Sequence, residues 1–133
     1  MLALPFSVMA QEKKAYDWTK VINAIIQVES KGNAKAYNPN GDCAGILQIT
    51  PGLVKQCNAW FKAKKSKKRY TLVDRYNVQK SKEMFVMYQT YLNKSNDVEK
   101  AIRIWNGGPG YTAAGTNDYL KKAMSHYKKK GAD

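Results

Sequence analysis

Hydrophobic residues early in the chain recur with the period of an α-helix. They occupy the i, i+3, i+4, i+7 and i+8 positions of one helix face: Trp18, Val21, Ile22, Ile25 and Ile26. This spacing predicts an amphipathic helix from Trp18 to Glu29, with Asp17 before it as an N-cap. One further turn along the same face reaches Glu29, so a carboxyl group ends a stripe that is otherwise apolar.

The rest of the chain predicts four more helices and one irregular insertion. Helical patterns cover about residues 50–61, 77–92, 98–105 and 116–127, with Thr50 as the N-cap of the second helix and Thr116 as the N-cap of the last. Residues 30–45 are rich in Gly, Asn and Pro and cannot continue a helix. A turn at Asn38–Asp42 predicts a small β-hairpin within residues 37–48, and Asn106–Gly110 is expected to be a loop.

The length of 133 residues corresponds to one domain that can bury a hydrophobic core. Residues 1–10 are almost wholly apolar and end in Val8-Met9-Ala10, a small-residue pattern that suits cleavage before Gln11. We therefore expect residues 1–10 to be the remnant of a signal peptide and residues 11–133 to be an exported domain, in the periplasm, the envelope or outside the cell. An N-terminal strand or helix turn is the alternative for the apolar stretch. It is too short to span a membrane, and no membrane span is expected.

The formal charge of +13 at pH 7 favours a polyanionic environment. Six of the eight residues from Lys62 to Arg69 are basic. No aromatic residues interleave with this basic run as a base-stacking surface requires, so we do not expect nucleic acid as a partner. The run is expected to bind anionic polymers of a cell envelope, and a solvated loop is its simpler interpretation.

Cysteine and histidine are scarce, which narrows the possible chemistry. His126 is the only histidine, so the sequence predicts no Ser-His-Asp or Cys-His mechanism, no metal site and no cofactor. Cys43 and Cys57 suit an exported protein, and we expect them to form a disulfide worth on the order of 3 kcal/mol. Two free buried thiols are the alternative.

Four motifs follow one another along the chain. They are Glu29-Ser30, A-G-I-L-Q-I-T-P at residues 44–51, I-W-N-G-G-P-G at 104–110 and T-N-D-Y-L-K-K-A at 116–123. Their order and spacing resemble the soluble lytic transglycosylases of the lysozyme superfamily, over about residues 18–127. That family has Glu-Ser at the end of a core helix, then G-L-M-Q, then a D-P-x-x-N-I segment matched here by residues 74–78, then A-Y-N-A-G-P-G and E-T-x-x-Y-V. The resemblance implies a mainly α, lysozyme-like single domain of the α+β superfamily, acting on the glycan strands of peptidoglycan.

The resemblance also implies a set of site residues. Glu29 is similar to the catalytic acid of the family. The matching sugar-binding positions are Ser30, Gly45, Ile46, Leu47, Gln48, Trp105, Asn106 and Tyr119. Trp105 replaces the family's Tyr, so only the ring packing of that residue is expected to remain. Structural roles stay open for these positions, above all for Asn106 as a turn residue and for Tyr119 as a core residue.

The chemistry can also be argued from the residues. Cleavage of a glycosidic bond requires an acid on the leaving oxygen, and a partly desolvated Glu29 would keep its proton near neutral pH. With a single carboxylate, the same group would then take the proton of the C6 hydroxyl of N-acetylmuramic acid, which attacks C1 and leaves a 1,6-anhydro end. A half-buried Glu29 in a structural ion pair is the simpler interpretation.

Two other functions remain open. In a hydrolytic lysozyme, Asp42 would help to place a water molecule, although Thr50 stands where goose-type lysozymes have an Asp. Asp42 is also a good turn residue in its own right. A non-catalytic module that binds envelope glycans by charge would not need Glu29. In each case a monomer is the expected state.

Overall fold

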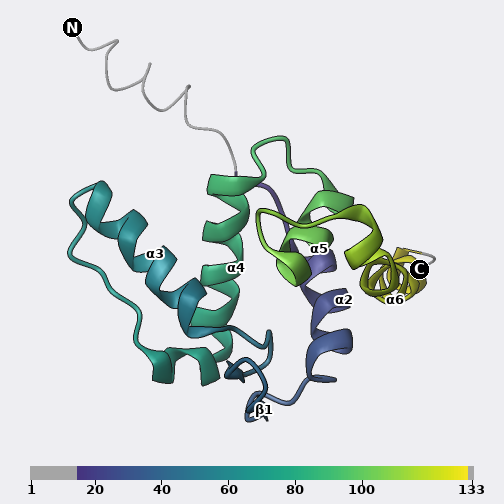
Figure 1. Ribbon diagram of the computed structural model, residues 1–133, viewed down its shortest axis with the longest axis horizontal. Helices are drawn as coiled ribbons and strands as arrows, with labels where there is room; N and C mark the ends of the chain where they lie inside the picture. Colours follow the sequence, from purple (N-terminus) through teal and green to yellow (C-terminus); the bar gives the residue numbers. More distant parts are fainter. Residues whose placement is uncertain (1–14, 132–133) are drawn as a thin grey trace, which may run out of the picture.

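The computed structural model describes residues 15–131, so the expected signal-peptide remnant at residues 1–10 lies outside the described part. Five α-helices appear within it (Figure 1): α2 (Thr19–Glu29), α3 (Pro51–Ala63), α4 (Val78–Leu92), α5 (Val98–Gly107) and α6 (Ala113–Gly131). A short hairpin pairs β1 (Tyr37–Asn38) with β2 (Cys43–Ala44), and a 3-10 helix, η1 (Leu72–Tyr76), precedes α4. The predicted fold class, mainly helical with one small antiparallel sheet, is confirmed.

The helices form two groups, with the hairpin below them in the view of Figure 1. α3 lies against α4 on one side, and α6 packs against both α2 and α5 on the other. The largest fully buried side chains of the core between them include Ile25, Leu47, Phe85 and Ile102. Because Leu47 belongs to the loop after β2, that loop is part of the core. No helix within residues 15–131 is long and apolar enough to cross a membrane.

Side-chain caps determine where three of the helices begin. Thr50, Asn77 and Asp97 precede α3, α4 and α5, and each accepts a hydrogen bond from the backbone N–H three residues later. The predicted start of α3 at Thr50 is confirmed. α5 includes Asn106, which the sequence placed in a loop, and it ends where Gly108 adopts a φ of +77°.

The start of α6 differs from the expectation. The sequence predicted Thr116 as the N-cap, but Thr112 has that role: its Oγ1 accepts a hydrogen bond from the Gly115 N–H at 3.0 Å. Thr116 is buried instead, and its hydroxyl accepts a hydrogen bond from Arg103 Nη1 at 2.8 Å. A threonine on the inner face of the first turn can therefore be mistaken for the cap.

The expected disulfide between Cys43 and Cys57 is not formed in the structure, where both residues are free thiols. Cys57 is fully buried in the core on α3, and burial raises its pKa to about 12. The Cys43 sulfur lies 3.9 Å from the carbonyl oxygen of Asn40, within the hairpin turn. One sulfur is thus enclosed by the core and the other belongs to the turn, and no bond joins them.

A buried arginine connects the hairpin to η1. Arg75 Nη1 donates to the carbonyl oxygens of Asp42 at 2.7 Å and Ile49 at 3.0 Å. The Arg75 carbonyl oxygen accepts a hydrogen bond from Ser81 Oγ at 2.9 Å, which links the same residue to α4. Because Arg75 is only 5% exposed, these bonds face little competition from water. Arg75 therefore sets the position of the hairpin relative to α4.

Gly45 is the position where the loop after β2 meets η1. Its φ is +85°, and a Cβ atom there would overlap the carbonyl oxygen of Arg75. Gly32, in the turn after α2, has a similar φ of +86° but open space around it. The two glycines thus share one backbone conformation and differ in their surroundings.

We predict that Gly45→Ala destabilises the protein more than Gly32→Ala. Both substitutions carry the cost of a left-handed backbone, about 1–2 kcal/mol. Only Gly45→Ala adds a collision with backbone atoms, for a total of about 2–5 kcal/mol. Urea titrations of the two variants and the wild type give the free energies of unfolding. Equal losses would show that the loop does not depend on its contact with Arg75.

Candidate active site

Glu29 is the last residue of α2, and its carboxyl group is partly withdrawn from water. The face of α2 that leads to it is buried, including Ile22, Ile25 and Ile26. Burial raises the pKa of Glu29 above its usual value, because desolvation disfavours the charged form. A hydrogen bond from Tyr119 lowers the pKa, but by less. Glu29 therefore holds its proton at a higher pH than an ordinary glutamic acid.

Tyr119 joins the last helix to this carboxyl group. Its hydroxyl donates to Glu29 Oε2 at 2.7 Å, across 90 residues of sequence. α6 packs directly on α2, and the Tyr119 ring lies against the edge of the core. Burial and the adjacent Glu29 carboxylate raise the pKa of Tyr119 far above its usual value, so the hydroxyl remains a donor. Tyr119 thus packs against the hydrophobic core with its ring and contacts Glu29 with its hydroxyl group.

The loop after β2 is held from two helices. Ser30, directly after α2, donates from Oγ to the Ile46 carbonyl oxygen at 2.8 Å. Trp105, on α5, donates from Nε1 to the next carbonyl oxygen, that of Leu47, at 3.2 Å. From the sequence, only ring packing was expected of Trp105. In the structure its ring does pack against Phe85, with 4.8 Å between the ring centroids, and its Nε1 makes this polar contact as well. The loop is therefore fixed to both α2 and α5.

Gln48 supports the same loop from within. It adopts a φ of +53°, and its Nε2 donates to the carbonyl oxygens of Gly45 at 3.0 Å and Ala36 at 3.3 Å. The backbone N–H of Gly45 donates to the Ala36 carbonyl oxygen as well, at 2.8 Å. The amide nitrogen of Gln48 is therefore engaged in holding the loop and the hairpin together.

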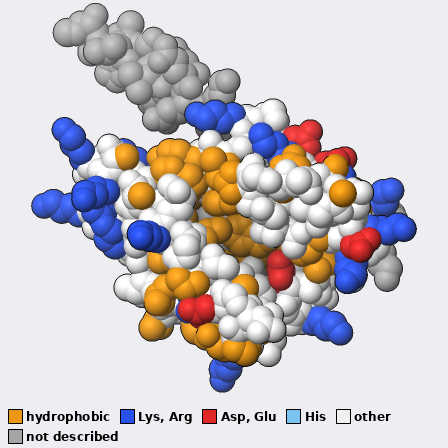
Figure 2. Space-filling model, in the orientation of Figure 1, with side chains coloured by type: hydrophobic (Ala, Val, Ile, Leu, Met, Phe, Trp, Pro, Cys, Tyr) orange, Lys and Arg blue, Asp and Glu red, His pale blue; other side chains and the backbone are white. Residues whose placement is uncertain are grey.

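A groove with a volume of about 390 Å³ lies between the start of α3, α4 and the end of α5. Three residues singled out from the sequence line it: Thr50, Trp105 and Asn106. Figure 2 shows hydrophobic side chains gathered along the middle of the visible face, between the α3–α4 side and the α5–α6 side. Glu29 does not line this groove, and the loop held by Ser30 and Trp105 connects the two. Aromatic and aliphatic walls with an amide at the edge suit an amphipathic ligand such as a sugar.

Asp42, the second acid considered, is bound by the arginine of η1. Its Oδ1 lies 3.4 Å from both Nη1 and Nη2 of Arg75, and its side chain is 45% exposed. Its backbone carbonyl oxygen has the shorter contact to the same guanidinium group, at 2.7 Å. Asp42 is therefore engaged in the hairpin, in a left-handed turn position with a φ of +53°.

Sequence reasoning missed Arg75, although it organises this side of the site. The signal available was its place within residues 74–78, which match the D-P-x-x-N-I segment, but that segment contains no arginine. A lone arginine in a polar connection is ordinarily assigned to the surface. Within residues 15–131, no three His, Cys, Asp or Glu side chains lie where they could together hold a metal ion.

Comparison with known proteins identifies a family. A family model described as transglycosylase SLT domain matches residues 6–129, which includes all four motifs and continues into α6. No curated protein and no solved structure matches the chain.

We predict that Glu29→Gln is at least as stable as the wild type at neutral pH. The folded-state pKa of Glu29 is raised, so wild-type stability is complete below the unfolded pKa and falls as the pH rises through the folded pKa. Gln carries no charge to desolvate, so the advantage of the variant should grow across that window and vanish at low pH. Thermal unfolding of both proteins from about pH 3 to about pH 8 measures this. A variant that is less stable at every pH would contradict the desolvation argument.

Proposed function

The chain belongs to the transglycosylase SLT domain family, which acts on the glycosidic bonds of peptidoglycan, and we propose that Glu29 performs this reaction as both acid and base. The proposed substrate is the β-1,4 bond between N-acetylmuramic acid and N-acetylglucosamine, and the proposed product has a 1,6-anhydromuramic end. The observation that carries the proposal is the partly buried Glu29 carboxyl group with the Tyr119 hydroxyl 2.7 Å away.

In the first step, Glu29 donates its proton to the glycosidic oxygen. The bond from this oxygen to C1 of the muramic acid breaks, and N-acetylglucosamine leaves as an alcohol. Positive charge develops on C1 and the ring oxygen, and the N-acetyl group of the substrate can stabilise it in place of a second carboxylate. Glu29 is left as a carboxylate that still accepts the hydrogen bond of Tyr119.

In the second step, the Glu29 carboxylate removes the proton of the C6 hydroxyl, and the C6 oxygen forms a bond to C1. Glu29 regains its proton, and no water is consumed. Such a residue has to work in both protonation states. Burial favours the acid form of Glu29 and the Tyr119 hydrogen bond favours the carboxylate, so the two opposed effects suit this double role.

The surroundings of Glu29 support a glycan strand as the ligand. The loop with Ile46 and Leu47 would form one wall of the cleft, and the groove at Trp105 and Asn106 would extend it. We infer that the protein works in the cell envelope, where the exposed basic run between α3 and η1 binds anionic polymers. In Figure 2 the Lys and Arg side chains gather at the α3 end and the α6 end of the visible face.

The contacts of Asp42 favour the lyase over a hydrolytic lysozyme. A hydrolase would need a second group that positions water opposite the leaving sugar. The Asp42 carboxylate is paired with Arg75, and its backbone carbonyl oxygen is bound by the same guanidinium group. Asp42 therefore has a structural partner that accounts for its place in the turn.

We predict that Glu29→Gln lowers the turnover of glycan strands by about 10²- to 10⁴-fold, the usual range for one general acid or base. Asp42→Asn should retain most of the activity, because Asn tolerates the left-handed turn and the backbone contact to Arg75 stays in place. Mass spectrometry of the soluble muropeptides should find anhydro ends, which are lighter by one water than reducing ends.

The same measurements separate the alternatives. Reducing ends, with Asp42→Asn as inactive as Glu29→Gln although folded, would identify a hydrolytic lysozyme. No release of muropeptides by the wild type, with wall binding retained, would identify a non-catalytic binding module.

We further predict that Tyr119→Phe moves the alkaline limb of the pH–activity profile to higher pH. The hydrogen bond from Tyr119 lowers the pKa of Glu29, so its loss raises that pKa and keeps the acid protonated further up the pH scale. Tyr127→Phe is the matched control, since Tyr127 is on the same helix and its ring lies under Lys20 Nζ. The measurement is kcat/KM on a soluble glycan as a function of pH. A profile that does not move would show that Tyr119 has only a packing role.

A further inference from the structure

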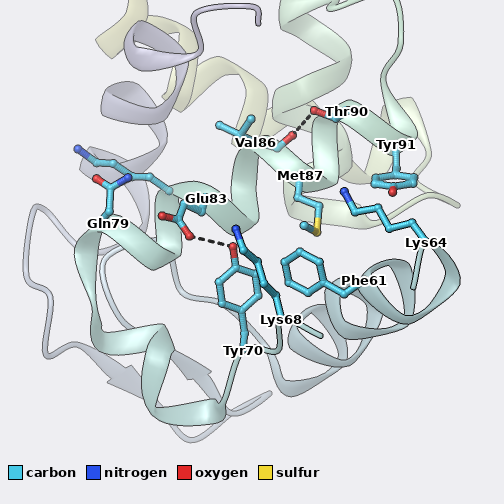
Figure 3. A pocket seen from close by; sticks show the side chains of 11 residues that line it. Phe61, Lys64, Lys68, Tyr70, Gln79, Glu83, Val86, Met87, Thr90 and Tyr91 are labelled. Atoms are coloured by element: carbon cyan, nitrogen blue, oxygen red, sulfur yellow. Dashed lines mark hydrogen bonds between the residues drawn. The ribbon is translucent and has the colours of Figure 1, made fainter. Parts of the chain in front are cut away.

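A second groove lies on the other side of α4, between this helix and the end of α3 with the basic run that follows it (Figure 3). Its volume is about 490 Å³, and it shares no lining residue with the groove at Trp105. Trp60 stands between the two: its ring stacks on Tyr91, which lines the second groove, at 4.3 Å, and lies 6.2 Å from Tyr88, which lines the first. Occupation of the second groove would therefore leave the candidate active site free.

The floor of the second groove is apolar. Phe61 and Met87 lie at its centre in Figure 3, with Tyr70 on one side and Tyr91 on the other. The Phe61 and Tyr70 rings pack at 5.4 Å, and the stacking on Trp60 holds Tyr91, so this floor is formed by side chains with fixed partners. Such a surface favours a ligand that has methyl or methylene groups to bury.

Three lysines surround this floor: Lys64 and Lys68 from the basic run and Lys82 from α4. Among the described residues, Glu83 is the one acid that lines the groove, and its Oε1 accepts a hydrogen bond from the Tyr70 hydroxyl at 3.0 Å. The charge pattern is thus mainly positive, with one carboxylate at the edge of the apolar floor. It suits a ligand that carries carboxylates, small apolar groups and one amine.

We propose that this groove is a second wall-binding site, and that it takes the short peptides attached to the glycan strands. Such stem peptides carry free carboxylates for the three lysines, alanine methyl groups for the Phe61–Met87 floor and, in walls that contain a diamino acid, an amine for Glu83. The proposal rests on the proposed wall substrate, because only that substrate brings stem peptides to the protein. The groove would hold the protein on the wall while Glu29 acts on the strand.

Two other anionic partners fit the groove less well. A phosphate polymer without amine substituents would satisfy the lysines but has little to place on the apolar floor and no cation for Glu83. A membrane surface would meet the lysines, yet the aromatic floor is recessed between α3 and α4, where a flat bilayer makes poor contact. Both partners remain as outcomes of the experiment.

The test compares two triple variants with the same change of charge. Lys64→Gln, Lys68→Gln and Lys82→Gln remove the lysines of the groove. The control is Lys55→Gln, Lys62→Gln and Lys67→Gln, which removes three exposed lysines of the same region that do not line it. Both triples carry Glu29→Gln, so that the wall is not digested during the binding measurement.

Binding is measured to purified sacculi that lack phosphate polymers, before and after an amidase has removed the stem peptides. On intact sacculi we expect the groove triple to bind roughly tenfold more weakly than the control triple. On stripped sacculi the two triples should bind alike. Equal affinities on intact sacculi, or a difference that survives stripping, would overturn the proposal.

Purified teichoic acid and phosphatidylglycerol vesicles provide the remaining arms. The groove triple, and not the control triple, could lose binding to teichoic acid or to the vesicles while still binding sacculi as well as the control. That result would assign the groove to phosphate or to lipid and overturn the proposal. Cleavage of peptide-free glycan strands is measured separately in proteins that keep Glu29. If the strands are cleaved but the two triples bind the wall equally well, only the proposal for the second groove is contradicted. If the groove triple binds the wall more weakly but no strands are cleaved, only the proposed function is contradicted.

Discussion

A carboxyl group kept partly dry at the end of a core helix is the constraint on which the other features of this protein depend. If water had free access to Glu29, its pKa would return to the ordinary range. Glu29 would then lose its proton at a lower pH and would be less able to act as an acid. Water is limited because α6 covers α2 and the loop after β2 returns to Ser30. The hydroxyl of Tyr119 donates a hydrogen bond to Glu29 and keeps the charged form accessible.

The loop of residues 44–49 is held in place by side-chain hydrogen bonds from other elements. Side chains from three different elements donate to its carbonyl oxygens: Ser30 after α2, Trp105 on α5 and Arg75 in η1. A side chain that donates to a carbonyl oxygen fixes backbone without requiring a longer strand, which explains how strands of two residues suffice here. Functional loops need such support if their walls are to stay in place.

Charge and chemistry are separated in the molecule. Tyr119 joins Glu29, whereas the basic run lies at the end of α3, where Lys64 and Lys68 line the second groove. Long-range attraction to an anionic wall can therefore act without placing a cation next to Glu29, where it would lower the pKa that the proposed acid requires. In the proposals above, wall binding and cleavage are accordingly assigned to different parts of the molecule.

The sequence by itself determined the helices, their order and the candidate acid, because these depend on local patterns. The 3.6-residue period that ends at Glu29, the Thr50 cap and the order of the four motifs are all readable along the chain. The tertiary structure alone decided what surrounds the acid. The Tyr119 hydroxyl reaches Glu29 from 90 residues away in the sequence, and the Arg75 guanidinium group binds the backbone of the hairpin. The two cysteines for which a disulfide was expected are both free. Periodicity reports which face of a helix is buried, but partners that come from distant segments are set by how the helices pack, and no local pattern contains that information.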